Sequence, residues 1–150
     1  MKHLFTLACL CFLTLGAKAQ AGSLTVSNNT GCTVYYIIRG ISAPLCGTPN
    51  SSSFIALAPL SSVTYANASM VPGLGLLPSD YITGADLYTS TSACAVFPTL
   101  FQVGEPCTGR VLAASYQVYN ASCTFCRAVP TNVNWVAAGF PGGVATLSFN

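Results

Sequence analysis

The sequence contains very little charge. Among 150 residues there are 5 Lys or Arg, 3 Asp or Glu and 1 His, so 5% are charged, whereas about a quarter of a typical soluble domain is charged. After residue 19 there is no Lys and no His, and three arginines (Arg39, Arg110 and Arg127) balance three carboxylates. Three scattered arginines cannot neutralise a track of phosphates. The composition therefore excludes nucleic acid and anionic membrane surfaces as electrostatic partners.

The shortage of titratable groups also limits catalysis. General acid-base catalysis favours His or a carboxylate with a shifted pKa, and only Asp80, Asp86 and Glu105 stand after residue 19. Without histidine, no Ser-His-Asp triad or Cys-His pair can form. A two-carboxylate glycosidase using Glu105 with either Asp is the enzyme alternative. We expect no enzyme activity, no catalytic residue, no bound metal and no cofactor, with Asp80 serving as a turn residue after Pro78-Ser79.

The longest apolar run lies at the N-terminus. The stretch "LFTLACLCFLTLG" follows Lys2 and His3 and precedes Ala17-Lys18-Ala19, which is the pattern of a secretory signal peptide with a small-x-small cleavage site. The run is shorter than the roughly 20 residues that a membrane-spanning helix needs. We predict a signal peptide over residues 1–19, cleavage between Ala19 and Gln20, and a secreted or cell-surface protein without a transmembrane segment. The ending "AKAQ" resembles the signal endings of exported bacterial proteins.

Six cysteines remain after the predicted cleavage site. They are Cys32, Cys46, Cys94, Cys107, Cys123 and Cys126. An even number in an exported chain predicts disulfides, here three. The preferred pairing is a local bridge between Cys32 and Cys46, with Cys94 and Cys107 bonded to the Cys123 and Cys126 segment or to each other.

The spacing Cys123-x-x-Cys126 is also found in redox motifs and zinc sites. A redox pair stands at the start of a helix, which lowers the pKa of the first thiol, but Pro130 follows too soon for a long helix. A zinc site would need histidine or a second cysteine pair of similar spacing. A structural disulfide role is therefore favoured over both alternatives.

Short alternating segments predict strands through most of the chain. "SLTVSN" precedes the turn residues Asn28 to Gly31, and "TVYYII" follows them as a first hairpin; "FIALA" and "SSVTY" form a second paired unit around Pro59. "YITGADLYTS" contains Gly84, which suggests a bulge or a close backbone approach. "CAVFPTLFQVG" and "RVLAASYQVYN" are further strands, although the alanines of the latter leave a helix possible.

The C-terminal part gives the clearest unit. "NVNWVAAGF" and "VATLSFN" flank Pro141-Gly142-Gly143 as a hairpin in which Ala145, Leu147 and Phe149 point to one side. "MVPGLGLLPSD" is apolar but rich in Gly and Pro, and we expect it to be a packed loop. Together these segments predict one domain over residues 20–150, an all-β, disulfide-stabilised antiparallel β-sandwich of about seven to eight strands with Greek-key connections.

Two segments carry a resemblance to a known family. "NNTGCTVYY" followed by "IALAPLSSVTY" resembles the opening of thaumatin-like β-sandwiches, where an Asn-x-Cys strand precedes a Leu-x-Pro-x-x-Ser strand. The resemblance covers about a quarter of the chain and implies a β-sandwich. It assigns no functional residue.

Two functions are compatible with these features. Strand edges normally carry Lys or other charges that block pairing with other chains, and residues 20–150 contain no Lys. This favours a structural or surface-assembly protein that associates with copies of itself or with cell-surface components, and "QAGSLTVSNN" could be donated to a neighbour as a strand. The alternative is a small extracellular module that binds glycan or another neutral ligand through aromatic side chains.

The aromatic residues are candidates for both binding and core packing. They comprise Tyr35, Tyr36, Tyr65, Tyr81, Tyr88, Tyr116, Tyr119 and Trp135. In a β-protein such residues more often fill the core or pair across strands. The adjacent Tyr35 and Tyr36 must lie on opposite faces of their strand. Arg39, at the end of that strand, is expected to pair with a carboxylate or cap a loop.

Overall fold

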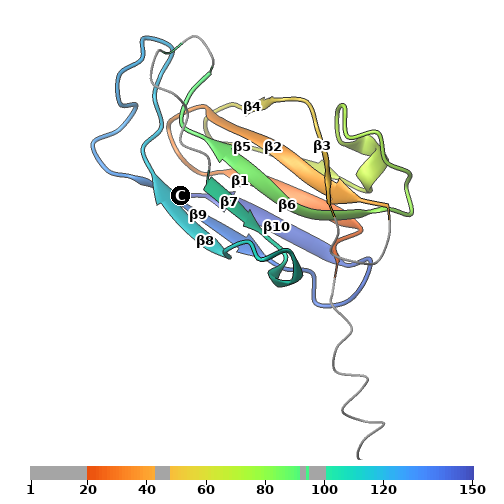
Figure 1. Cartoon of the computed structure of the whole chain (residues 1–150). Coiled ribbons are helices and arrows are strands. Elements are labelled where there is room, and N and C mark those ends of the chain that lie inside the picture. The colour runs from red at the N-terminus through yellow and green to blue at the C-terminus, as the bar shows by residue number, and fades with distance from the viewer. Residues whose placement is uncertain (1–19, 43–47, 92–93, 95–100) are drawn as a thin grey trace, which may run out of the picture.

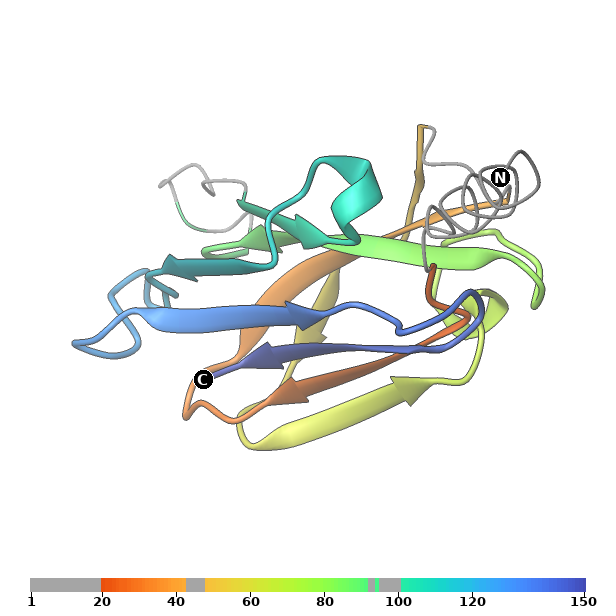
Figure 2. The same ribbon diagram turned by 90° about the horizontal axis from the view of Figure 1, so that it is seen from below.

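The computed structural model describes residues 20–42, 48–91, 94 and 101–150. Within these residues the chain forms two five-stranded sheets, mostly antiparallel, that pack together (Figures 1 and 2). The predicted signal peptide, its cleavage site at Ala19 and the cysteine Cys46 lie outside the described residues.

The first sheet, called here the C-terminal sheet, has the strand order β5-β1-β10-β9-β8. Its strands are β1 (Ser23–Asn28), β5 (Ser61–Tyr65), β8 (Ala113–Tyr116), β9 (Thr131–Val136) and β10 (Val144–Phe149). The predicted hairpin is confirmed as β9 and β10, and Ala145, Leu147 and Phe149 are all fully buried. One pair departs from the expected antiparallel sheet, because β1 and β10 run parallel.

The second sheet has the order β3-β2-β6-β7, and β4 also pairs with β2. Its strands are β2 (Val34–Ile41), β3 (Asn50–Ser51), β4 (Ile55–Leu57), β6 (Tyr81–Tyr88) and β7 (Phe101–Gly104). The expected count of seven to eight strands was too low, because two short strands, β3 and β4, share one side of β2. The segment "RVLAASYQVYN" contains a strand, β8, and the apolar stretch after Met70 is a packed loop in which Val71, Leu74 and Leu76 are buried.

The first predicted hairpin is wrong, because β1 and β2 belong to different sheets. Asn28 explains the crossing. Its buried side chain donates hydrogen bonds to the carbonyl oxygens of Cys32, Leu57 and Ala58, at 2.7, 3.1 and 2.8 Å. Its Oδ1 accepts from the backbone N–H and the hydroxyl of Thr30. The amide thus holds residues 28–32 as an arch between the sheets.

The second predicted unit is divided in the same way. β4 pairs with β2 while β5 pairs with β1, so the turn at Pro59 and Leu60 connects the two sheets. The N-terminal segment that could be donated to a neighbour contains β1, which lies between β5 and β10 of its own chain.

Gly84 lies at a β-bulge, as expected from its place within a predicted strand. Arg39 pairs with Gly84, but the next residue, Gly40, pairs with Ile82, so Thr83 is the extra residue of a bulge. A Cβ on Gly84 would lie 2.5 Å from the carbonyl oxygen of Val103 and 2.8 Å from Cδ of Arg110. Glycine is therefore required here for the close approach of β7 and the Arg110 side chain.

Two disulfides connect distant segments. Cys32 bonds to Cys126 across 94 positions, and Cys94 bonds to Cys123 across 29. The expected local bridge from Cys32 to Cys46 is therefore wrong, whereas Cys94 does bond to the Cys123 and Cys126 segment. Cys107 is also disulfide-bonded.

Candidate interaction surface

Asp86 is the centre of a buried charge cluster. Its side chain is fully buried, and its Oδ2 accepts hydrogen bonds from Nε and Nη2 of Arg39, the former at 2.6 Å. Nη1 of Arg110 donates to Oδ1 at 2.6 Å, and the Arg110 side chain is only 8% exposed. The expected pairing of Arg39 with a carboxylate is confirmed. Asp86 therefore holds two of the three arginines of residues 20–150 against the second sheet.

The other two carboxylates are buried as well. Asp80 lies in the turn before β6, where its Oδ2 accepts the N–H of Leu77 at 2.7 Å, as expected for a turn residue. Glu105 is fully buried, and its Oε1 accepts the N–H of Ala138 at 3.3 Å. Burial raises the pKa of Glu105, while the Ala138 N–H and the nearby Trp135 indole oppose the rise; the indole does not reach hydrogen-bond geometry.

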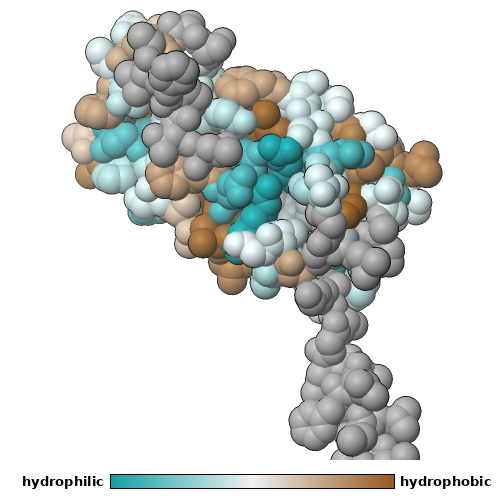
Figure 3. All heavy atoms as spheres, viewed as in Figure 1, coloured by the Kyte–Doolittle hydropathy of each residue, from teal (hydrophilic) through white to brown (hydrophobic). Residues whose placement is uncertain are grey.

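The exposed surface is consequently almost neutral. All three carboxylates of residues 20–150 are buried, and Arg127 is the remaining cation, partly exposed and outside the Asp86 cluster. Among the described residues, eleven large apolar side chains are exposed, Leu60, Phe140 and Leu77 most of all. On the face in Figure 3, hydrophobic residues are interspersed with hydrophilic ones. A neutral surface of this kind favours association.

The outer face of the C-terminal sheet carries rows of small polar side chains. Cross-strand pairing places these residues in two rows. One row contains Thr64, Thr25 and Thr146, and the other contains Ser62, Ser27, Ser148 and Asn134. Oγ1 of Thr25 and Oγ1 of Thr64 lie 3.2 Å apart. These rows carry hydroxyl and amide groups without any charge, and the exposed side chains of Val136 and Val144 lie on the same face.

The edge of this sheet at β5 has unpaired backbone groups. On β1, the N–H groups of Ser23 and Asn29 donate to β10 or to the residue before it. Backbone N–H and C=O groups alternate sides along a strand. Val26 therefore directs its backbone groups toward β5, where it pairs with Val63. Ser62 and Thr64 therefore direct their N–H and C=O groups away from β1, toward the open edge. Figure 2 shows β5 at the lower margin of the sheet, with β1 as its neighbour.

The other strand edges of the described residues are less accessible. β3 and β4 are two and three residues long, with Pro49 directly before β3 and Pro59 two residues after the end of β4. Short strands and prolines are typical of protected edges. At the opposite margin, β7 packs beside β8. The N–H of Gly104 donates to the carbonyl of Val111 at 3.1 Å, and the rings of Phe101 and Tyr116 stack with centroids 5.5 Å apart.

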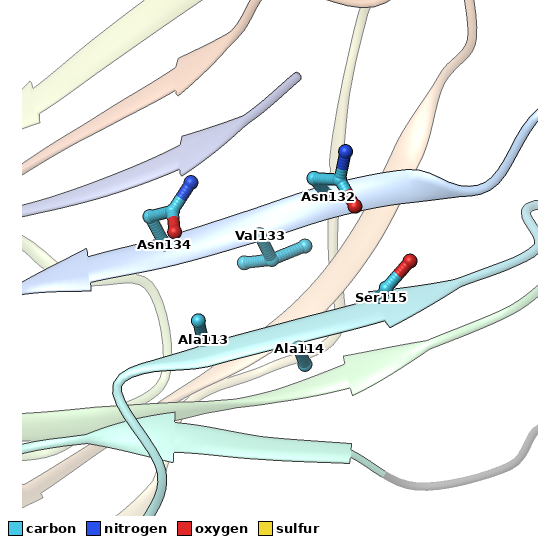
Figure 4. Close-up of a pocket in the computed structure, with 6 residues that line it drawn as sticks. All are labelled: Ala113, Ala114, Ser115, Asn132, Val133 and Asn134. Carbon is cyan, nitrogen blue, oxygen red and sulfur yellow. The ribbon is translucent and has the colours of Figure 1, made fainter.

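A shallow depression of about 500 Å³ lies on β8 and β9. Its exposed side chains include Asn132, Asn134 and Ser115, which Figure 4 shows along the two strands. The six lining residues include no aromatic ring and no charged group. The depression can offer amide and hydroxyl hydrogen bonds to a neutral ligand, but no stacking surface.

Most candidate aromatic residues pack inside the protein. Five of them are buried, namely Tyr35, Tyr36, Tyr65, Tyr116 and Trp135. Tyr36 faces the core, with its ring centroid 5.9 Å from that of Phe149. Tyr35 lies on the opposite face of β2 and is covered by Phe54, which also contacts Tyr88 with centroids 5.3 Å apart. Phe54 itself is 45% exposed and Tyr88 is partly exposed, so part of the cluster faces solvent.

The Cys123-x-x-Cys126 motif is not a dithiol in this structure. Cys123 and Cys126 bond to Cys94 and Cys32 respectively, so the two sulfurs hold different parts of the fold together. Among the described residues there is no group of three or more His, Cys, Asp or Glu that could bind a metal, and no helix that could cross a membrane.

Comparison with protein families, curated proteins and solved structures finds no match. The resemblance to thaumatin-like sandwiches thus receives no support from relatives. The sequence indicated the neutrality of the candidate surface and the strand at β5. It did not reveal that β5 is an edge, because this depends on the pairing of β1 with β10 far along the chain.

Proposed function

We propose that this is a secreted, non-enzymatic structural or surface-assembly protein that self-associates through an uncharged strand edge. The observation that carries the proposal is the open edge of β5, where Ser62 and Thr64 present unpaired backbone groups without a nearby charge. Natural proteins usually protect such edges with Lys, Pro or a covering segment, because exposed edges pair with other chains.

The placement of the charges supports this proposal. Asp86 forms ion pairs with both Arg39 and Arg110, and Asp80 and Glu105 are buried with backbone partners. These carboxylates therefore have structural roles, and the surface has little charge repulsion to keep copies apart. The two disulfides are typical of an oxidising compartment, which supports an extracellular location.

The test is the mass of the purified protein over a concentration series, by size-exclusion chromatography with light scattering, followed by electron microscopy of the heavier fractions. We expect dimers or larger species that increase with concentration. A single-chain mass at every concentration would refute the proposal.

The depression on β8 and β9 favours a second candidate function, a module that binds glycan or another neutral ligand through Asn132, Asn134 and Ser115. A glycan array with the wild-type protein and the Asn132→Ala, Asn134→Ala double variant distinguishes the two functions. Binding that the double variant loses would favour this module, whereas silence on the array together with concentration-dependent assembly would favour the structural protein.

A further inference from the structure

We propose that β5 of one molecule pairs antiparallel with β5 of a second copy, about a twofold axis at Val63. This inference rests on the proposed function and names its first contact. The two five-stranded C-terminal sheets would then join into one continuous sheet of ten strands across the dimer. A twofold contact uses the same surface on both copies, so that surface must be complementary to itself.

The backbone direction restricts the register. A hydrogen-bonded antiparallel pair requires both residues to direct their N–H and C=O groups toward each other. Within β5, only Ser62 and Thr64 direct their backbone N–H and C=O groups toward the open edge. Three registers are therefore possible: Ser62 can face Thr64 of the second copy, Ser62 can face Ser62, or Thr64 can face Thr64. Self-pairing of Ser62 would place Leu60 opposite Thr64, but the Leu60 N–H already donates to the Thr30 carbonyl at 3.1 Å.

Pairing Ser62 with Thr64 uses both outward residues of each copy. It forms two hydrogen-bonded pairs related by the twofold axis, with about four backbone hydrogen bonds in total. Self-pairing of Thr64 would instead place Ser62 opposite Ala66, which lies beyond the end of β5. The register centred on Val63 is therefore the one that keeps every pair within the two strands.

The side chains agree with this register. Val63 is partly buried against the core, and it would face Val63 of the second copy, so the apolar inner side of the sheet continues across the contact. Ser62 and Thr64 are exposed on the outer side, where they would extend the rows of hydroxyl groups. No charged side chain belongs to β5, so the symmetric pairing brings no like charges together.

Leu60 provides a separate observation at the same edge. Its side chain is 79% exposed, and its backbone has φ 50°, a left-handed conformation that is uncommon for a residue with a Cβ. In the register centred on Val63, Leu60 stands opposite Ala66 of the second copy. The contact would cover an apolar side chain that the single chain leaves in water.

Cysteine cross-linking tests the register directly. In a non-hydrogen-bonded antiparallel pair the Cα atoms lie about 4.5 Å apart, which is within the roughly 4.4 to 6.8 Å that a disulfide spans. Val63→Cys should therefore give a covalent dimer under mild oxidation on a non-reducing gel. Thr64→Cys serves as the matched control, because position 64 faces position 62 in this register.

Charge variants test the contact without a covalent bond. Ser62→Lys with Thr64→Lys places like charges opposite each other at both ends, and should raise the dimer dissociation constant at least about tenfold. Ser62→Glu with Thr64→Lys places opposite charges there, and should retain the dimer at low salt. Thr146→Lys with Ser148→Lys adds the same charge to the same face on β10, away from the edge, and should leave dimerisation unchanged.

The outcomes separate this inference from the proposed function. Wild-type assembly that neither β5 variant changes would overturn the β5 contact while leaving self-association intact. Efficient cross-linking by Thr64→Cys but not Val63→Cys would overturn the register. A wild-type protein that stays a single chain at all concentrations would overturn both. Thermal unfolding of each variant checks that the fold is retained.

Discussion

The two described disulfides should differ in their contribution to stability. The replacement of Cys32 and Cys126 by Ala opens a loop of 94 positions, and the replacement of Cys94 and Cys123 opens one of 29. In the chain-entropy model these loops correspond to about 4.7 and about 3.6 kcal/mol of unfolding free energy. Replacing both members of each pair leaves no new free thiol. Because a domain is typically stable by only about 5 to 15 kcal/mol, either loss is large.

Equilibrium unfolding in urea, without reductant, measures both variants against the wild-type protein. We expect both to be less stable, with the Cys32 and Cys126 variant lower by about a further 1 kcal/mol. The bond between Cys32 and Cys126 ties the arch after β1, which joins the two sheets at one end, to the loop before β9. This variant releases the arch from that loop. If the Cys94 and Cys123 variant were the less stable of the two, loop closure would not be the main source of the stabilisation.

Three further predictions concern two buried carboxylates, Asp86 and Glu105, and the glycine at the bulge, Gly84. Asp86→Asn should lower the free energy of unfolding by about 3 to 5 kcal/mol in urea titrations, because it leaves Arg110 buried without a full counter-charge. Asp80→Asn should lower the free energy of unfolding by less, because Asp80 stabilises a single turn. Burial raises the pKa of Glu105, so the folded state holds a proton that the unfolded state releases, and stability should fall as pH rises from about 4.3 toward the raised pKa. Glu105→Gln should remove this pH dependence, and an unchanged dependence would contradict the assignment. Gly84→Ala should destabilise the protein by about 1 to 3 kcal/mol in thermal unfolding, because its Cβ would meet the Val103 carbonyl.

The local features of the fold could be predicted from the sequence. Alternating residues located β1 and β5, runs of β-branched and aromatic residues located β2 and β6, and the Pro141-Gly142-Gly143 turn located the final hairpin. These signals lie within a few neighbouring residues. Gly84 also marked the bulge correctly. Each of these features depends on backbone geometry that a short segment determines by itself.

The long-range features could not be predicted in this way. The parallel pairing of β1 with β10 joins residues about 120 positions apart, and the bond from Cys32 to Cys126 spans most of the fold. The arch at Asn28 looked like a hairpin turn, because its residues are the same ones that turns use. Composition indicated a neutral surface, but only the fold shows that the three carboxylates are buried and that β5 is an open edge.

The weight-average mass of the wild-type protein by sedimentation equilibrium, from micromolar to millimolar concentration, tests the central claim most directly. The account predicts a mass that rises from that of one chain toward that of two or more as the concentration increases. A mass that stays at one chain throughout this range would contradict it.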